Sequence, residues 1–207
     1  MIPENWSDRL KSGLNKLEIV ASPEIEAKIL QHMALIREEC QRMNLVSSRD
    51  RDSLIERHVI PSLYGMKFIK NENLRVICIG SGAGFPGVEV KLFRPAIRLT
   101  LLEATKKKAI FLEKVVSELS LDSVEVKWER AENITEPKHD IAMARAVAPM
   151  VKLQDWVAPL LKKSGKLIAW KGSRFQEEMQ AVKIPRFQVE SVYPYEPPQI
   201  IVVFRKI

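Results

Sequence analysis

Four glycines within eight residues are the feature of this 207-residue sequence with the clearest chemical meaning. They lie in Gly80–Gly87 (GSGAGFPG), directly after the apolar run Val76–Ile79. An apolar run that ends at glycine is typical of a buried parallel strand, and glycine lets the next residues turn sharply and approach a ligand. Pro86 suits the first turn of a helix. The pattern predicts a strand, a ligand-binding loop and a helix.

The glycine spacing alone fits two nucleoside cofactors. Gly82, Gly84 and Gly87 match the dinucleotide fingerprint, and Glu103 lies about 20 residues further on, as that fingerprint requires. Gly80, Gly82 and Gly84 match the S-adenosylmethionine loop of methyltransferases equally well. A tight turn without a ligand is the third interpretation, so other residues must decide between them.

Charged residues follow the other short apolar runs, which are Leu99–Leu102, Val124–Trp128, Ile141–Ala144 and Leu167–Trp170. The carboxyl ends of parallel strands meet at one edge of a sheet, where ligands bind. Glu103 can accept hydrogen bonds from both hydroxyls of a ribose, and Ala131 with Glu132 can line an adenine. Arg145 can hold a carboxylate through two parallel N–H bonds, and the methionine part of S-adenosylmethionine carries one. Lys171 follows the last of these runs.

The elements that would position these residues form an α/β fold. Short apolar runs alternate with helical periods, which indicates a parallel sheet with helices on both faces. Residues 186–193 and 199–205 read as a hairpin that ends the sheet with an antiparallel strand. Residues 1–68 are expected to form a helical cap, with helices over about 6–17, 23–43 and 53–68, and residues 69–207 the main domain. His32 is expected at the surface of the second helix.

The composition favours a polyanionic partner. Thirty-three Lys and Arg residues against twenty-six Asp and Glu residues give a net charge of +7. Lys106, Lys107 and Lys108 open a predicted helix, where positive charge opposes the macrodipole by roughly 0.3–1 kcal/mol per charge. Contact with RNA phosphates would explain them, and a solvated charge run is the alternative. Arg174 is the fourth residue that we expect to bind RNA.

The remaining features indicate a cytoplasmic protein, which we expect to be a monomer. Cys40 and Cys78 have no metal-binding spacing and read as free thiols of a reducing compartment, and we expect no bound metal. The first residues carry no signal-peptide pattern, and no apolar run approaches the ~18 residues that a membrane span needs.

Two features favour the sulfonium cofactor over NAD. Residues 161–168 (LKKSGKLI) resemble the entry to the fifth strand of methyltransferases, and the closing hairpin matches their antiparallel last strand. A nicotinamide enzyme would more often continue in parallel units and supply a residue that handles a proton.

Taken together, the sequence resembles the bacterial 16S ribosomal RNA guanine-N7 methyltransferase family (RsmG, also called GidB). The resemblance rests on Asn44-Leu45, Glu56-Arg57-His58, Ser62-Leu63, Gly80–Gly87, Arg94-Pro95, Leu101–Glu103, Lys107, Phe111-Leu112, Arg130–Glu132, Ala144–Ala146, Ala148 and Lys171-Gly172. The sequence departs from the family pattern at Cys78 and Pro61, where the family usually has aspartates.

The resemblance implies a Rossmann-like fold with a mostly parallel seven-stranded sheet. It implies that Gly80, Phe85, Ala131, Glu132 and Arg145 bind S-adenosylmethionine. It also implies methylation of N7 of one guanine in the 530 loop of 16S rRNA, presented as RNA or as a small-subunit particle.

The chemistry of guanine agrees with the residues present. N7 has an exposed lone pair and no proton to lose, so methyl transfer needs alignment more than a general base. We therefore predict no catalytic base and expect Arg145 and Lys171 near the reacting centre. An NAD-dependent oxidoreductase and a non-catalytic RNA-binding protein on a methyltransferase fold are the two alternatives.

Overall fold

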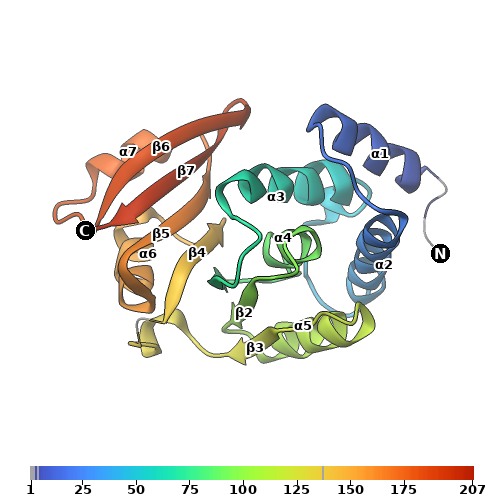
Figure 1. The fold of residues 1–207 in the computed structure, drawn as a ribbon, viewed down its shortest axis with the longest axis horizontal. Helices are drawn as coiled ribbons and strands as arrows, with labels where there is room; N and C mark the ends of the chain where they lie inside the picture. The colour runs from blue at the N-terminus through green and yellow to red at the C-terminus, as the bar shows by residue number, and fades with distance from the viewer. Residues whose placement is uncertain (1–2, 4, 137) are drawn as a thin grey trace.

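The protein is built on one seven-stranded sheet with helices on both faces (Figure 1). The computed structural model describes residue 3, residues 5–136 and residues 138–207; the predicted cap includes residues 1, 2 and 4, which lie outside this part. The strands, in chain order, are β1 Arg75–Ile79, β2 Arg98–Glu103, β3 Val124–Trp128, β4 His139–Arg145, β5 Leu161–Lys171, β6 Phe187–Glu196 and β7 Gln199–Lys206. Their order in the sheet is β3-β2-β1-β4-β5-β7-β6.

The topology confirms the predicted fold class. β1 to β5 pair in parallel, whereas β7 is antiparallel to both of its neighbours, β5 and β6. The order of the strands switches sides between β1 and β4, because β2 and β3 lie on one side of β1 whereas β4 and β5 lie on the other. Ligands of open α/β sheets bind beside such a switch point.

Alternate side chains of the central strands enter two different cores. On β1, Val76 and Cys78 pack against the helices before and after the strand, whereas Ile77 and Ile79 pack on the opposite face. The first face is covered by the helices that follow β1 and β2, on which the helices before β1 pack. The second face is covered by α6 (Met150–Val157) and α7 (Phe175–Gln180), as Figure 1 shows. Burial on both faces explains why the β1 and β2 runs are almost entirely apolar.

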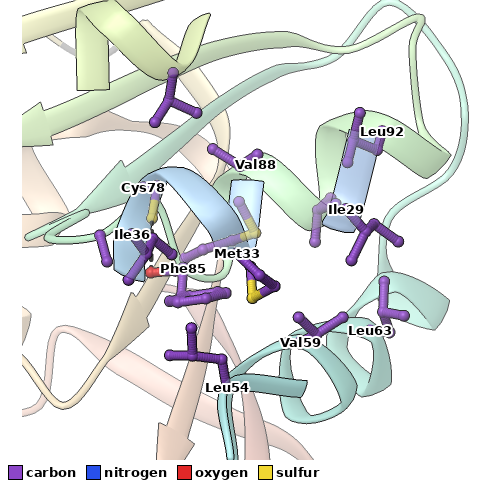
Figure 2. Close-up of a cluster of buried hydrophobic side chains, with 14 of the residues drawn as sticks. Ile29, Met33, Ile36, Leu54, Val59, Leu63, Cys78, Phe85, Val88 and Leu92 are labelled. Atoms are coloured by element: carbon purple, nitrogen blue, oxygen red, sulfur yellow. Dashed lines mark hydrogen bonds between the residues drawn. The ribbon is translucent and has the colours of Figure 1, made fainter. Parts of the chain in front are cut away.

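The helices before β1 share a core with the sheet. α1 (Trp6–Lys16) and α2 (Pro23–Glu39) begin where predicted, although α2 ends four residues before the predicted end at residue 43. The Ser22 side chain caps α2 by accepting a hydrogen bond from the Ile25 N–H at 3.3 Å. Figure 2 shows apolar side chains of α2 packed around Phe85 of the glycine segment (Gly80–Gly87) and Val88 of the helix after it. Residues far apart in the sequence are thus joined by one continuous apolar cluster.

The prediction of a surface position for His32 is wrong. Its side chain is fully buried, because it lies on the same face of α2 as Ile29 and Ile36, three residues after one and four before the other. The segment predicted as one helix over 53–68 is divided into π-helical turns Ile55–Val59, α3 Ile60–Tyr64 and 3₁₀ turns Gly65–Phe68. Pro61 stands at the start of α3, where its missing N–H is tolerated.

The remaining helices, α4 (Gly87–Phe93) and α5 (Lys106–Glu118), follow β1 and β2. Cys40 and Cys78 are free thiols, and both are buried. In the described part of the chain, no helix combines the length and the apolar composition that crossing a bilayer would require.

Candidate functional site

The glycine segment turns tightly at the carboxyl end of β1. Gly80 has φ +62° and Gly84 has φ +107°, conformations that side chains with a Cβ rarely adopt. A Cβ at Gly80 would lie 3.2 Å from the Val147 side chain, and one at Gly84 would lie 2.8 Å from Val88. Glycine therefore keeps the segment tight and keeps the space beside Val147 open.

Glu103, the last residue of β2, holds this segment in place. One of its carboxylate oxygens accepts the N–H of Gly82 and the other accepts the N–H of Thr105, both at 2.9 Å. The side chain is almost fully buried, so these bonds form in a site with little water. A carboxylate offers about four acceptor positions, and two of these stay available for the hydroxyls of a ribose.

A first hollow of about 110 Å³ brings four of the predicted cofactor residues together. Gly80, Glu103, Ala131 and Glu132 line it, joined by Trp156 from α6. Its wall contributes mostly apolar atoms, which suits the flat faces of a purine ring.

A second hollow of about 410 Å³ contains the predicted reacting-centre residues. Arg145 and Lys171 line it together with Arg174, Trp170 and Tyr195. Lys171 donates hydrogen bonds to the Ala148 carbonyl at 3.0 Å and to the Glu178 carboxylate at 2.7 Å, so its positive charge is paired. The Arg145 guanidinium donates to the carbonyls of Arg57 and His58. Arg145 therefore ties the sheet edge to the helical segment before β1.

The two hollows adjoin, because Val147 lines both. A larger hollow of about 450 Å³ lies at the amino ends of β1 to β4, where Arg75, Arg98 and His139 line it. That edge has no glycine segment, and ligands of parallel sheets bind at the carboxyl edge. We therefore assign the site to the adjoining pair of hollows.

Phe85 is placed differently from the other predicted cofactor residues. Its side chain is buried in the helical core and lines neither of the two hollows. The His58 ring stacks on it, with 4.9 Å between ring centroids and 23° between planes. Burial and the charge of Arg145 lower the pKa of His58 to about 4, although Asp50 opposes this shift. His58 is therefore neutral at pH 7.

This shift predicts acid-sensitive stability. The ordinary pKa of histidine is 6.5, so the unfolded chain binds the His58 proton more tightly than the folded protein does. The contribution is complete above pH 6.5 and is lost as the pH falls towards 4, with a total of about 3 kcal/mol. Urea unfolding of wild type and of His58→Phe, which keeps the ring without a titrating group, measures this loss.

His139 also has a pKa lowered by burial, and it remains in both proteins. The expected result is a smaller loss of stability between pH 6.5 and pH 4 in the variant than in the wild type. Equal losses in the two proteins would show that His58 does not cause the acid sensitivity.

A buried pair that sequence reasoning did not identify holds the glycine segment from the other side. His32 Nε2 lies 2.8 Å from the Ala83 carbonyl and must donate to it, because a carbonyl only accepts. Nδ1 lies 2.8 Å from Glu89 Oε1, so one proton is shared between these two atoms. The signal in the sequence was the position of His32 on the apolar face of α2, together with a lone acid inside the apolar α4.

The predicted RNA-binding lysines begin α5 at the same edge of the sheet. Lys106 and Lys107 are exposed, and Lys108 is half-buried. Within the described ranges, none of the three has a carboxylate oxygen within 4.0 Å. Arg174 lies elsewhere, at the start of α7 beside the second hollow. The structure therefore separates the four predicted RNA contacts into two groups.

Comparison with known proteins identifies the family. The family described as rRNA small subunit methyltransferase G (GidB) matches residues 25–200. The ribosomal RNA small subunit methyltransferase G of Dictyoglomus thermophilum is 36% identical over 168 residues, which cover 78% of this chain and 70% of that protein. Its counterpart in Mesoplasma florum is 37% identical over 182 residues, 86% of this chain and 75% of that protein.

Solved structures with low sequence identity share the fold. A predicted O-methyltransferase of Agrobacterium tumefaciens superposes with a TM-score of 0.60 at 17% identity, over 72% of this chain and 80% of that one. A SAM-dependent methyltransferase of Aquifex aeolicus gives a TM-score of 0.58 at 14% identity, over 70% and 89%. The fold is thus that of Rossmann-like methyltransferases, and this chain belongs to the rRNA small subunit methyltransferase G family.

Proposed function

We propose that this protein transfers a methyl group from S-adenosylmethionine to N7 of a guanine in the 530 loop of 16S rRNA. The observation that carries the proposal is the pair of adjoining hollows beside the glycine segment, which offers a small compartment for the adenine of a nucleoside cofactor and a larger one for a second purine. Methyltransferases of this family take the methyl group from S-adenosylmethionine. Membership of the family therefore favours this cofactor over NAD.

The residues of the first hollow fit that cofactor. Glu103 has acceptor positions left for the ribose hydroxyls, and Ala131 with Glu132 lies where an adenine would be lined. S-adenosylmethionine supplies an electrophilic methyl group on a sulfonium centre. Arg145 would face the cofactor carboxylate or a phosphate of the RNA from the second hollow.

The residues of the second hollow suit a purine lifted out of an RNA loop. Trp170 and Tyr195 give it aromatic surface, and Arg145 gives it positive charge. Lys171 acts here as a positioning residue, because its bonds to Ala148 and Glu178 fix the loop after β4 against α7. No proton must be removed from N7, so orientation is the main contribution of the protein.

Product analysis tests which atom is methylated. Purified protein is incubated with small ribosomal subunits and with S-adenosylmethionine carrying a labelled methyl group, and the RNA is digested to nucleosides. We expect the label to elute with 7-methylguanosine. Label in any other nucleoside would contradict the proposal, and the same assay without the protein serves as the blank.

The lysines at the start of α5 make a further prediction about RNA binding. Replacing Lys106, Lys107 and Lys108 with alanine is expected to weaken binding and to lower the slope of log affinity against log salt by about 2, since each phosphate contact on single-stranded RNA contributes about 0.7. Filter binding between 50 and 200 mM salt measures the slope. A variant with alanine at the exposed Lys152 and Lys183 is the control. An unaltered slope in the triple variant would mean that these lysines do not contact RNA and form a solvated charge run.

A further inference from the structure

Trp128 is far more exposed to solvent than the tryptophans of the core. More than half of its surface, 57%, is open to solvent, whereas Trp6 and Trp170 are 1% and 4% exposed. It ends β3, the edge strand of the sheet, and pairs with Glu103 of β2. The ring thus stands at the carboxyl edge, beside the first hollow. A single exposed aromatic residue is ordinary on a protein surface, so the location and contacts of Trp128 carry the inference and its exposure alone does not.

The ring is held in one orientation. Its Nε1–H donates to the carbonyl of Ala104, a residue that lines the first hollow, at 3.1 Å. The Lys106 ammonium lies 4.9 Å from the ring centroid, within the range of a cation–π contact. The residue is therefore a fixed aromatic surface with a cation on it, and it does not need to be ordered when a partner binds.

The charge around the ring favours an anionic partner. The first turn of α5 has no acidic residue, and the Thr105 side chain does not cap it, so free N–H groups add to the charge of Lys106. Of the nearby carboxylates, Glu132 pairs with Arg130 at 3.2 Å, whereas Glu129 accepts from the neutral Asn133 amide at 2.7 Å and keeps its charge. An aromatic face with adjoining cations is the chemistry that binds unpaired nucleotides, with the base on the ring and the phosphate at the cations.

We propose that Trp128 and Lys106 form a stacking platform for an unpaired RNA base near the methylated guanine. The inference rests on the proposed function and extends it, because it adds a second nucleotide contact outside the two hollows. The contact would help to hold the RNA loop open while the target base occupies the second hollow.

Binding of a 16S rRNA fragment that contains the 530 stem-loop tests this platform. Trp128→Leu keeps an apolar side chain without a π face, and Trp128→Phe keeps a smaller face. Stacking is worth enough for the leucine variant to bind roughly 5- to 100-fold more weakly, and the phenylalanine variant is expected to recover most of this loss. Affinity for S-adenosylmethionine alone should stay the same in both variants, which shows that they are folded.

A spectroscopic readout accompanies the affinities. RNA should quench the tryptophan emission of the wild type, and Trp128→Phe should lose the greater part of this quenching while it still binds. Wild-type affinity in Trp128→Leu, or a phenylalanine variant as weak as the leucine variant, would overturn the platform. A change from dimer to monomer in Trp128→Leu, seen by sedimentation, would also overturn it and assign the surface to a second copy. Failure of the wild type itself to bind RNA would instead contradict the proposed function.

Discussion

Replacing Glu103 with alanine is expected to weaken S-adenosylmethionine binding by about 100-fold or more. The carboxylate accepts two backbone N–H groups, those of Gly82 and Thr105, and would also accept the ribose hydroxyls. Hydrogen bonds to a charged group contribute about 1.5–3 kcal/mol each, so loss of the ribose contacts alone accounts for this factor. Isothermal titration calorimetry with S-adenosylmethionine measures it.

The matched control is Glu113→Ala, which removes an exposed glutamate from α5 and is expected to leave the affinity unchanged. Circular dichroism at the titration temperature checks that both variants are folded. Similar dissociation constants for Glu103→Ala and the wild type would mean that the cofactor ribose lies elsewhere.

Replacing His32 with alanine is expected to give the largest loss of stability, about 3–5 kcal/mol. His32 and Glu89 are both fully buried, and Glu89 Oε2 has no hydrogen-bond partner in the described structure. Without the imidazole, neither oxygen of this carboxylate would be bonded, and the Ala83 carbonyl would lose its donor as well. A buried unpaired acid is much more costly than the lost pair itself is favourable. Equilibrium unfolding in urea measures the change.

A double variant tests whether the contributions of His32 and Glu89 to stability are coupled. His32→Leu combined with Glu89→Leu removes both polar partners, so it is expected to be clearly more stable than His32→Leu alone. Gln31→Ala, on the same helix, removes one hydrogen bond to Glu118 and should cost about 1 kcal/mol. Additive effects of the two leucine substitutions would show that His32 and Glu89 are not coupled.

The same pair connects stability to the cofactor site. His32 belongs to α2, yet its Nε2 donates to the middle of the glycine segment, and a Cβ at Gly84 would lie 3.0 Å from that atom. The helices before β1 therefore form one wall of the segment that the cofactor must approach. Loss of His32 is expected to reduce affinity for S-adenosylmethionine in addition to stability.

The sheet could be predicted because its signals are local. The apolar runs of β1 and β2 are buried on both faces and end in glycine or charge, and the hairpin of β6 and β7 is marked by prolines between two strand-like runs. β5 was only partly predicted. It begins at Leu161, but exposed Lys162 and Lys163 interrupt the apolar pattern, and an irregular register between β4 and β5 accommodates them.

The site was predicted less completely, because much of it depends on contacts between distant segments. The sequence predicted Glu103, Ala131, Glu132 and Arg145 as site residues by their place after strands. The structure places the first three with Gly80 at the first hollow and Arg145 at the second hollow. It could not show that Arg145 is anchored on the carbonyls of Arg57 and His58, which are almost ninety residues earlier in the chain. Backbone acceptors of this kind leave no trace in side-chain patterns.

Phe85 and His32 illustrate the other limit. A pattern of residue types gives the face of a helix or the presence of a loop, but it does not give the partner across the interface. The Phe85 ring turns away from the hollows and packs between His32 and His58, with centroids at 5.4 Å and 4.9 Å. Figure 2 shows how closely the surrounding apolar side chains enclose it. The Phe85 ring therefore anchors the glycine segment to the helical core.

The most direct test of the account is a map of N7-methylated guanines in 16S rRNA from cells with and without this protein, made by reductive cleavage at 7-methylguanosine. The account predicts one cleavage site in the 530 loop that is present with the wild-type protein and absent both without it and with Glu103→Ala. An identical cleavage pattern with and without the protein would contradict it, as would a protein-dependent site outside that loop.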